Sequence, residues 1–209
     1  MIRFPEVNLV QDRVPGAPPI TLYQLSTHTA GLATEPDDTD RYVKGPYADW
    51  EKTLTAALPH TRYILAPGAR FSYSNIGYAI LGAALARAAG ETYLDYVPKH
   101  ILKPSGMSHS GLYLDSRMLP HLAKGYEVTR TGIDSETPLR EHEGRGYKMP
   151  NGAMYTTVGD LARFASFFMG EGPDTVLNVT SFERSLAASA ERDLSAVMAS
   201  ASKRAVLEI

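Results

Sequence analysis

The triplet Tyr73-Ser74-Asn75 brings proton-transfer and hydrogen-bonding side chains together, directly ahead of a long apolar run. A tyrosine at a helix N-terminus suits acyl transfer, because the positive end of the helix dipole favours a phenolate. An asparagine two residues later can hold a substrate amide through its donor and its acceptor together. A structural role fits equally well, because Ser74 or Asn75 can cap the helix and stabilise it by about 1 kcal/mol. The triplet alone leaves both interpretations open.

Other residues with chemical potential form weaker patterns. The six histidines never form the i, i+4 pair with a glutamate that a helical zinc site uses, so we expect no metal. No glycine-rich phosphate loop is present, and we expect no cofactor. Ser108-His109-Ser110 is predicted to be a surface turn, because sequence neighbours point in different directions and rarely share a hydrogen bond suited to nucleophilic attack.

The composition excludes several classes of protein. The chain has 209 residues, 44% of them hydrophobic, and a formal charge of −2 without a basic stripe, so nucleic acid is not an expected partner. It has no cysteine, and no apolar run approaches the ~20 residues that span a bilayer, so we expect no membrane span. The first residues contain no apolar segment typical of a secretory signal.

Helix signals recur along the first 170 residues, and capping residues frame them. Thr21 and Gln24 form a capping box for a short helix that ends near residues 26–28. The run 76–89 keeps one apolar face at helical spacing, with Gly90 as its C-terminal cap. A third helix is predicted from Thr92 toward Leu102, with a kink at Pro98 inside the pattern.

The later part of the chain mixes elements. Alternation at 126–133 predicts a small hairpin, and the polar, glycine-rich segment 140–152 predicts a loop. Thr157 with Asp160 caps a predicted helix at 158–169. We expect that helix to turn four apolar residues toward the core: Leu161, Phe164, Ala165 and Phe168. Residues 181–209 are alanine- and serine-rich and predict a loosely docked helical tail. The expected fold class is mainly α with a small β-hairpin.

Three stretches, taken together, resemble a known superfamily. They are "FPEVNLV" with "ITLYQLSTHTAGL" between residues 4 and 32, "PGARFSYSNIGYAILGAALARAAGETYLDYVPKHILKPSGMSHSGL" at 67–112 and "PNGAMYTTVGDLARF" at 150–164. Their order is similar to that in the serine β-lactamase and DD-peptidase superfamily, particularly its class C β-lactamase and esterase branch. The resemblance covers about residues 4–178. We therefore divide the chain into a β-lactamase-like region at 1–178 and a divergent tail at 179–209.

The resemblance implies roles for the triplet. Tyr73 matches the superfamily's second-motif tyrosine, a general acid/base in acyl transfer. Asn75 would contact the amide of the substrate's acyl side chain, and Ser74, the variable residue between them, would lie at the same substrate-binding site. The residues His28 and Thr29 match a stretch that we interpret as scaffold closing a helix. They are not predicted to be catalytic.

Two of the superfamily's motifs are not found where the resemblance places them. The Ser-x-x-Lys motif, in which a lysine activates the nucleophilic serine, precedes the stretch resembling residues 4–7 in relatives, so this chain begins too late to contain it. The third motif, Lys-Thr-Gly or His-x-Gly, would follow residue 178, but residues 181–209 contain no glycine. A literal Ser-x-x-Lys match, Ser200 to Lys203, is as frequent as chance predicts.

The resemblance implies the helical lobe of an α+β fold whose sheet packs beside it. We therefore expect an exposed apolar face and self-association through it. The leading hypothesis is a serine hydrolase acting by acyl transfer on an ester, a β-lactam or a D-amino-acid peptide, with this chain inactive alone. The alternatives are a non-catalytic binding or interaction module derived from that superfamily, and a helical structural domain with coincidental motifs. Relatives are often periplasmic or secreted, but the sequence leaves the compartment open.

Overall fold

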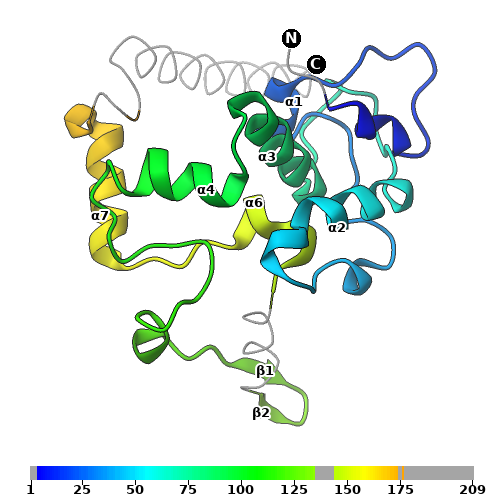
Figure 1. The fold of residues 1–209 in the computed structure, drawn as a ribbon. Coiled ribbons are helices and arrows are strands. Elements are labelled where there is room, and N and C mark those ends of the chain that lie inside the picture. Colours follow the sequence, from blue (N-terminus) through cyan, green and yellow to red (C-terminus); the bar gives the residue numbers. More distant parts are fainter. Residues whose placement is uncertain (1–3, 135–143, 174–175, 177–209) are drawn as a thin grey trace, which may run out of the picture. The chain divides into compact units, whose positions relative to one another are not determined.

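The computed structural model describes residues 4–134, 144–173 and 176. These residues are mostly helical with one two-stranded hairpin, as the sequence predicts (Figure 1). The helices are α1 (Leu22–Ser26), α2 (Trp50–Ala57), α3 (Asn75–Ala89), α4 (Tyr93–Val97), α6 (Met149–Gly152) and α7 (Val158–Ser166), and the strands are β1 (Glu127–Thr129) and β2 (Gly132–Asp134). Short 3₁₀ or π-helical turns cover Pro5–Leu9, Thr39–Arg41, Tyr47–Asp49, Leu58–His60, Pro98–Leu102, Leu119–His121, Gly146–Lys148 and Phe167–Glu171. No described helix has the length and apolar character needed to cross a membrane.

The chain divides into two compact units. The first contains residues 1–99 and 109–156, and the second contains residues 100–108 and 157–209. Helices α1 to α4, α6 and the hairpin belong to the first unit, and α7 belongs to the second. All three residues of the Tyr73-Ser74-Asn75 triplet therefore lie within the first unit.

Helix α3 is the central element of the first unit and confirms the predicted helix. Ser74 caps its N-terminus, and Gly90 ends it in the left-handed conformation, with φ 70°. Helices α1, α2, α4 and α6 all contact it. Gly82 permits the contact with α6, because a Cβ at that position would collide with the Pro150 ring. Most of the face between these ends is buried, including Ile76 and Ile80.

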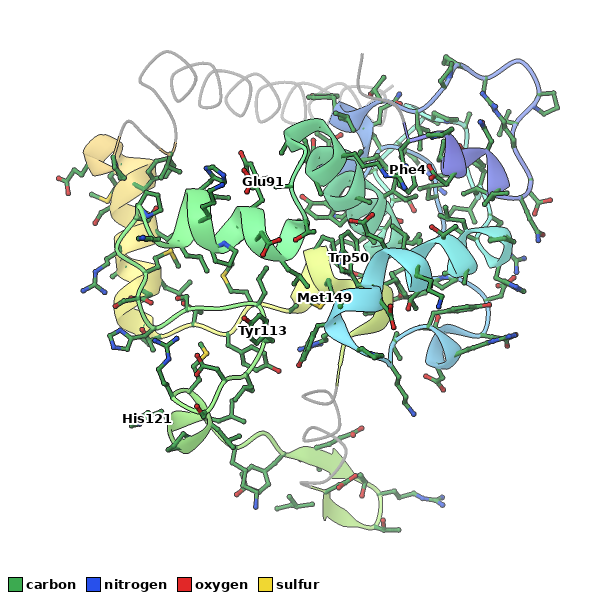
Figure 2. All side chains as sticks on the ribbon, in the orientation of Figure 1. Phe4, Trp50, Glu91, Tyr113, His121 and Met149 are labelled. Carbon is green, nitrogen blue, oxygen red and sulfur yellow. The ribbon has the colours of Figure 1, made fainter. Side chains whose placement is uncertain are left out.

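Helix α2 supplies much of the core beside α3, although the sequence analysis assigned no element between residues 33 and 66. Trp50, Leu54 and Ala57 are buried and follow one another at helical spacing. Figure 2 shows the side chains of Trp50, from α2, and Met149, from α6, in the packed interior of this unit. The helix is short, and Asp49 stands at its N-cap position without making a side-chain capping hydrogen bond.

The two short helices α1 and α4, which both contact α3, form where capping residues predict them. Thr21 and Gln24 make the complete capping box at the start of α1. Thr92 caps α4 through the backbone N–H of Asp95 at 3.1 Å. Helix α4 ends at Val97, and a π-helical turn continues from Pro98 to Leu102, so the predicted interruption at Pro98 is confirmed.

Strands β1 and β2 form the predicted antiparallel hairpin. Glu127 pairs with Asp134, Val128 with Ile133 and Thr129 with Gly132. The hairpin extends away from the helices of its unit (Figure 1), and the side chains of Val128 and Ile133 are exposed. The turn chemistry therefore determines the hairpin, because its apolar side chains bury little surface.

The predicted loop at 140–152 is wrong over the part that the structure describes, while residues 140–143 lie outside the described residues. The segment from Gly146 to Gly152 forms one 3₁₀ turn followed by α6. Tyr147 and Met149 are fully buried inside it. Gly146 has φ 51°, and a Cβ there would collide with the Tyr42 carbonyl oxygen. Long-range packing therefore orders a segment whose composition is typical of a loop.

Helix α7 confirms the predicted cap but not the predicted orientation. The Thr157 hydroxyl accepts from the backbone N–H of Asp160 at 3.2 Å. Leu161 is 49% exposed, and Phe164 and Ala165 are exposed as well, so the expectation that this face points to the core is wrong. The helix buries Asp160 instead, with Arg163 bound to its carboxylate at 2.8 Å. The predictions for the Phe168 side chain and for the tail at 181–209 lie outside the described residues.

Candidate functional site

The segment His28–Glu35, which follows α1, holds the backbone of the triplet through a series of hydrogen bonds. The N–H of Ser72 donates to the carbonyl of His28 at 2.7 Å, and the N–H of Asn75 donates to the carbonyl of Thr34 at 2.9 Å. The Thr34 hydroxyl donates to the carbonyl of Tyr73 at 3.0 Å. Because the two segments are hydrogen-bonded to each other at several points, the backbone of the triplet is held in place at the start of α3.

Ser74 connects that segment to the helix. Its hydroxyl donates to the carbonyl of Ala33 at 2.7 Å and accepts from the N–H of Gly77 at 3.0 Å. The residue is 3% exposed. The hydroxyl therefore has its proton and one lone pair occupied, and of the two capping candidates Ser74 takes the role.

Tyr73 lies at the surface against a histidine. The residue is 51% exposed, and its ring lies 4.3 Å, centroid to centroid, from the ring of His28, with 34° between the planes. The same imidazole stacks on Tyr78 at 4.7 Å and meets the edge of Phe71 at 5.7 Å. The phenol is thus supported on one side by an aromatic cluster and accessible on the other.

The protonation of His28 follows from its contacts. Its Nδ1 accepts the backbone N–H of Ser74 at 3.1 Å, so the proton of the neutral ring is on Nε2. Burial lowers the pKa of His28, which keeps the imidazole neutral beside Tyr73 at neutral pH. The backbone at His28 has φ 55°, an uncommon conformation for a residue with a side chain. The ring is therefore placed by both backbone and side-chain bonds.

Asn75 takes part in a polar cluster with two residues from other parts of the chain. Its Nδ2 donates to Glu35 Oε1 at 2.6 Å, and Lys148 Nζ donates to the same oxygen at 2.8 Å. About a quarter of the Glu35 and Lys148 side-chain surfaces is exposed. Lys148 precedes α6, which contacts α3, so the packing of α6 brings the ammonium to the start of α3.

Tyr73, Ser74 and Asn75, the site residues predicted from the sequence, all lie at the N-terminus of α3. Glu35 and Lys148 were not predicted, because they are 113 positions apart and share no local pattern. His28 carried a signal, because it lies inside one of the three stretches that resemble the superfamily, but it was interpreted as scaffold.

The sequence also raised the questions of a metal site and of a second Ser-x-x-Lys match. Among the described residues, no three His, Asp or Glu side chains are grouped so that they could hold a metal ion. The literal Ser-x-x-Lys match at Ser200 to Lys203 lies outside the part of the chain that the structure describes.

Comparisons with known proteins agree with these motifs. The family model described as "Beta-lactamase" matches residues 5–203. The chain is 33% identical over 165 residues to "Beta-lactamase-like protein 2" of Dictyostelium discoideum, which covers 77% of this chain but 28% of that protein. A solved class C β-lactamase is 24% identical with a TM-score of 0.58, over 75% of this chain and 40% of its own.

A second solved structure is the octameric penicillin-binding protein homologue from Pyrococcus abyssi. It is 22% identical with a TM-score of 0.60, and the match covers 88% of this chain and 42% of that one. At these identities the two structures establish the fold alone, and the chain spans less than half the length of each of these three relatives. The match of the family model over most of the sequence shows that this chain belongs to the β-lactamase family of serine hydrolases and penicillin-binding-protein relatives.

Proposed function

We propose that the chain contributes the tyrosine side of the active site of a β-lactamase-related serine hydrolase, which transfers the acyl group of an ester, a β-lactam or a D-amino-acid peptide. The observation that carries the proposal is the half-exposed ring of Tyr73, fixed at the N-terminus of α3 against a neutral imidazole. In this proposal the described residues correspond to the helical lobe of the α+β fold.

Tyr73 would move the proton during acyl transfer. As a serine oxygen attacks the carbonyl carbon, the phenolate takes the serine proton and passes it to the departing nitrogen or oxygen. Water then attacks the acyl-enzyme, and the proton movements run in reverse. The His28 ring packs against one face of the phenol and leaves its hydroxyl at the surface for this role. The bonds that the Ser74 N–H and the Ser74 hydroxyl donate, to His28 and to the Ala33 carbonyl, position Tyr73 and Asn75 on either side of it.

A second function rests on a specific observation. The described residues contain no Ser-x-x-Lys motif, so the nucleophile is not among them. Without a serine to deprotonate, Tyr73 cannot support the formation of an acyl-enzyme. The chain by itself would then bind acyl ligands or a protein partner without turnover. This non-catalytic module is the alternative to the hydrolase.

Covalent labelling separates the two functions. The purified chain is incubated with a fluorescent penicillin and with a fluorophosphonate, and its intact mass is then measured. A stoichiometric adduct on the chain itself overturns the inactive module. The absence of any adduct, together with labelling of a form that carries the family's Ser-x-x-Lys segment, supports a hydrolase whose nucleophile lies outside the described residues.

The role of Tyr73 is tested by measuring turnover in a form of the protein that also carries the family's Ser-x-x-Lys segment. Tyr73→Phe should lower turnover by about 10²- to 10⁴-fold, because it removes the proton-transfer group and keeps the ring. Tyr113→Phe is the matched control, because Tyr113 is 49% exposed and its hydroxyl is proposed to take no part. Equal turnover in both variants would show that the Tyr73 hydroxyl transfers no proton and that the residue serves only in packing.

We also propose that copies of the chain associate through the exposed apolar side chains of α7 and of the π-helical turn that follows it. Val158, Leu161 and Met169 are all exposed in the second unit, and the relative from Pyrococcus abyssi is an octamer. Leu161→Glu should shift the mass measured by light scattering toward that of the monomer. A monomeric wild-type chain would contradict this part of the proposal.

A further inference from the structure

Helix α2 forms one wall of a pocket that contains none of the residues of the candidate functional site. The pocket has a volume of about 400 Å³, and sites for small molecules usually have volumes of about 300–1,000 Å³. Four residues at helical spacing, from the N-cap of α2 onward, line it: Asp49, Lys52, Thr53 and Ala56. The first unit therefore carries a second concave site with its own lining chemistry.

Two turns supply further walls of this pocket. Arg41 and Tyr42 come from a 3₁₀ turn and the residue that follows it, and His60 ends another such turn. The rings of Tyr42 and His60 lie 5.7 Å apart, centroid to centroid. The backbone N–H of Asp37, just before the first turn, donates to the carbonyl of His60 at 2.7 Å. This bond holds the two turns together, so the pocket is formed before a ligand binds.

The charges that line the pocket are not paired with one another. The Arg41 guanidinium and the Lys52 ammonium form no ion pair with any residue that the structure describes. The Asp49 side chain makes no capping bond to α2. The Thr53 hydroxyl donates its proton to the Asp49 carbonyl at 3.1 Å, so the two cations are the stronger donors for a ligand. Two positive charges and one negative charge leave a formal charge of +1.

We propose that this pocket binds a small monocarboxylate with an apolar body, whose carboxylate accepts from Arg41 and Lys52. A planar carboxylate matches the two-pronged guanidinium and has lone pairs left for a second cation. Tyr42, Pro46 and Ala56 line the same pocket and offer apolar contacts to the body of the ligand. This binding site does not depend on acyl transfer at the candidate functional site.

The Asp49 carboxylate restricts the charge of the ligand. One negative charge on the ligand balances the formal charge of the lining. A phosphate monoester carries about 1.5 to 2 negative charges at neutral pH, and the excess would be repelled by Asp49. An ammonium group would be repelled by Arg41 and Lys52. A monoanion therefore fits the pocket better than either.

Binding to the unchanged 209-residue chain tests the inference. The probes are benzoate, benzamide, benzylamine and phenyl phosphate, which share the phenyl ring and differ in the charge that they carry. Binding is followed through the imidazole ¹H–¹³C signals of His60, assigned by their loss in His60→Asn. Benzoate should bind with a Kd of about 1 mM, which two charge-assisted hydrogen bonds can supply. Benzamide and benzylamine should bind at least about tenfold more weakly, and phenyl phosphate should also bind less tightly than benzoate.

Three exposed residues provide the variants. Lys52→Gln removes one cation and should weaken benzoate binding about tenfold. Lys44→Gln is the matched control, because Lys44 is also exposed and lies three positions after Arg41 but does not line the pocket. Its affinity for benzoate should stay unchanged. Asp49→Asn should strengthen the binding of benzoate and of phenyl phosphate, because it removes a charge that repels both.

Each contrary result overturns the inference. Equal affinity for benzoate and benzamide would show that the pocket makes no use of its charges, and tighter binding of phenyl phosphate would assign the pocket to phosphates instead. The inference also fails if no probe shifts the His60 signals at about ten times the expected Kd. Equal weakening by Lys52→Gln and Lys44→Gln would show that benzoate responds only to the overall charge of the chain.

Discussion

Replacing Ser74 by alanine should destabilise the first unit far more than the loss of an ordinary helix cap. The Ser74 hydroxyl makes two bonds, one to the N–H of Gly77 at the start of α3 and one to the carbonyl of Ala33. Alanine removes both. The second bond joins α3 to the segment that holds Tyr73, so its loss also loosens the candidate site.

The magnitude follows from the two bonds. Loss of the cap costs about 1 kcal/mol. The Ala33 carbonyl then loses its partner in a part-buried position, which adds about 1–2 kcal/mol. The total is about 2–3 kcal/mol. Thr92→Ala provides the comparison. Thr92 caps α4 in the same unit, and its hydroxyl also donates to the Asp95 carboxylate at 2.7 Å, but both side chains are exposed and water replaces that bond, so the loss stays close to the cap contribution of about 1 kcal/mol.

Urea denaturation of the two variants, followed by circular dichroism, measures the difference. Ser74→Ala should lower the free energy of unfolding by at least about 1 kcal/mol more than Thr92→Ala does. Equal losses would refute the reasoning, since they would show that the bond to Ala33 contributes nothing beyond the cap.

Two further predictions concern the segment that holds the triplet. Gly31→Ala should cost several times as much stability as Gly90→Ala in the same denaturation assay: both glycines have positive φ, but only at Gly31 would a Cβ collide with the Leu65 carbonyl. Similar losses would show that the backbone there shifts freely. Because burial lowers the pKa of His28, the unfolded chain binds its proton first, so stability should fall as pH drops below about 6.5. In His28→Asn, which tolerates the positive φ, the same titration should show a smaller loss, and an identical pH dependence would contradict it.

Much of the local structure was predictable because short-range chemistry determines it. Each of these features depends on residues within four positions of it: the capping box at Thr21, the start and the end of α3, and the break at Pro98. Helix α2 and the helical turns at 146–152 were missed because their stability comes from burial against distant parts of the chain. The orientation of α7 was predicted wrongly for a related reason: periodicity locates an apolar face but does not say whether another element covers it.

The candidate site combines these two kinds of information. The sequence places Tyr73 and Asn75 beside each other and marks them as chemically capable, but it describes Asn75 as a residue with a free donor and a free acceptor. In the structure the donor of Asn75 is bound to Glu35, which lies 40 residues away in the sequence. Glu35 in turn is bound by Lys148, which lies 113 residues from it. A side chain's type limits which bonds it can make, whereas its long-range neighbours decide which bonds are left for a ligand. The hydrogen bonds of Asn75 are therefore a property of the folded unit, even though the triplet is contiguous in sequence.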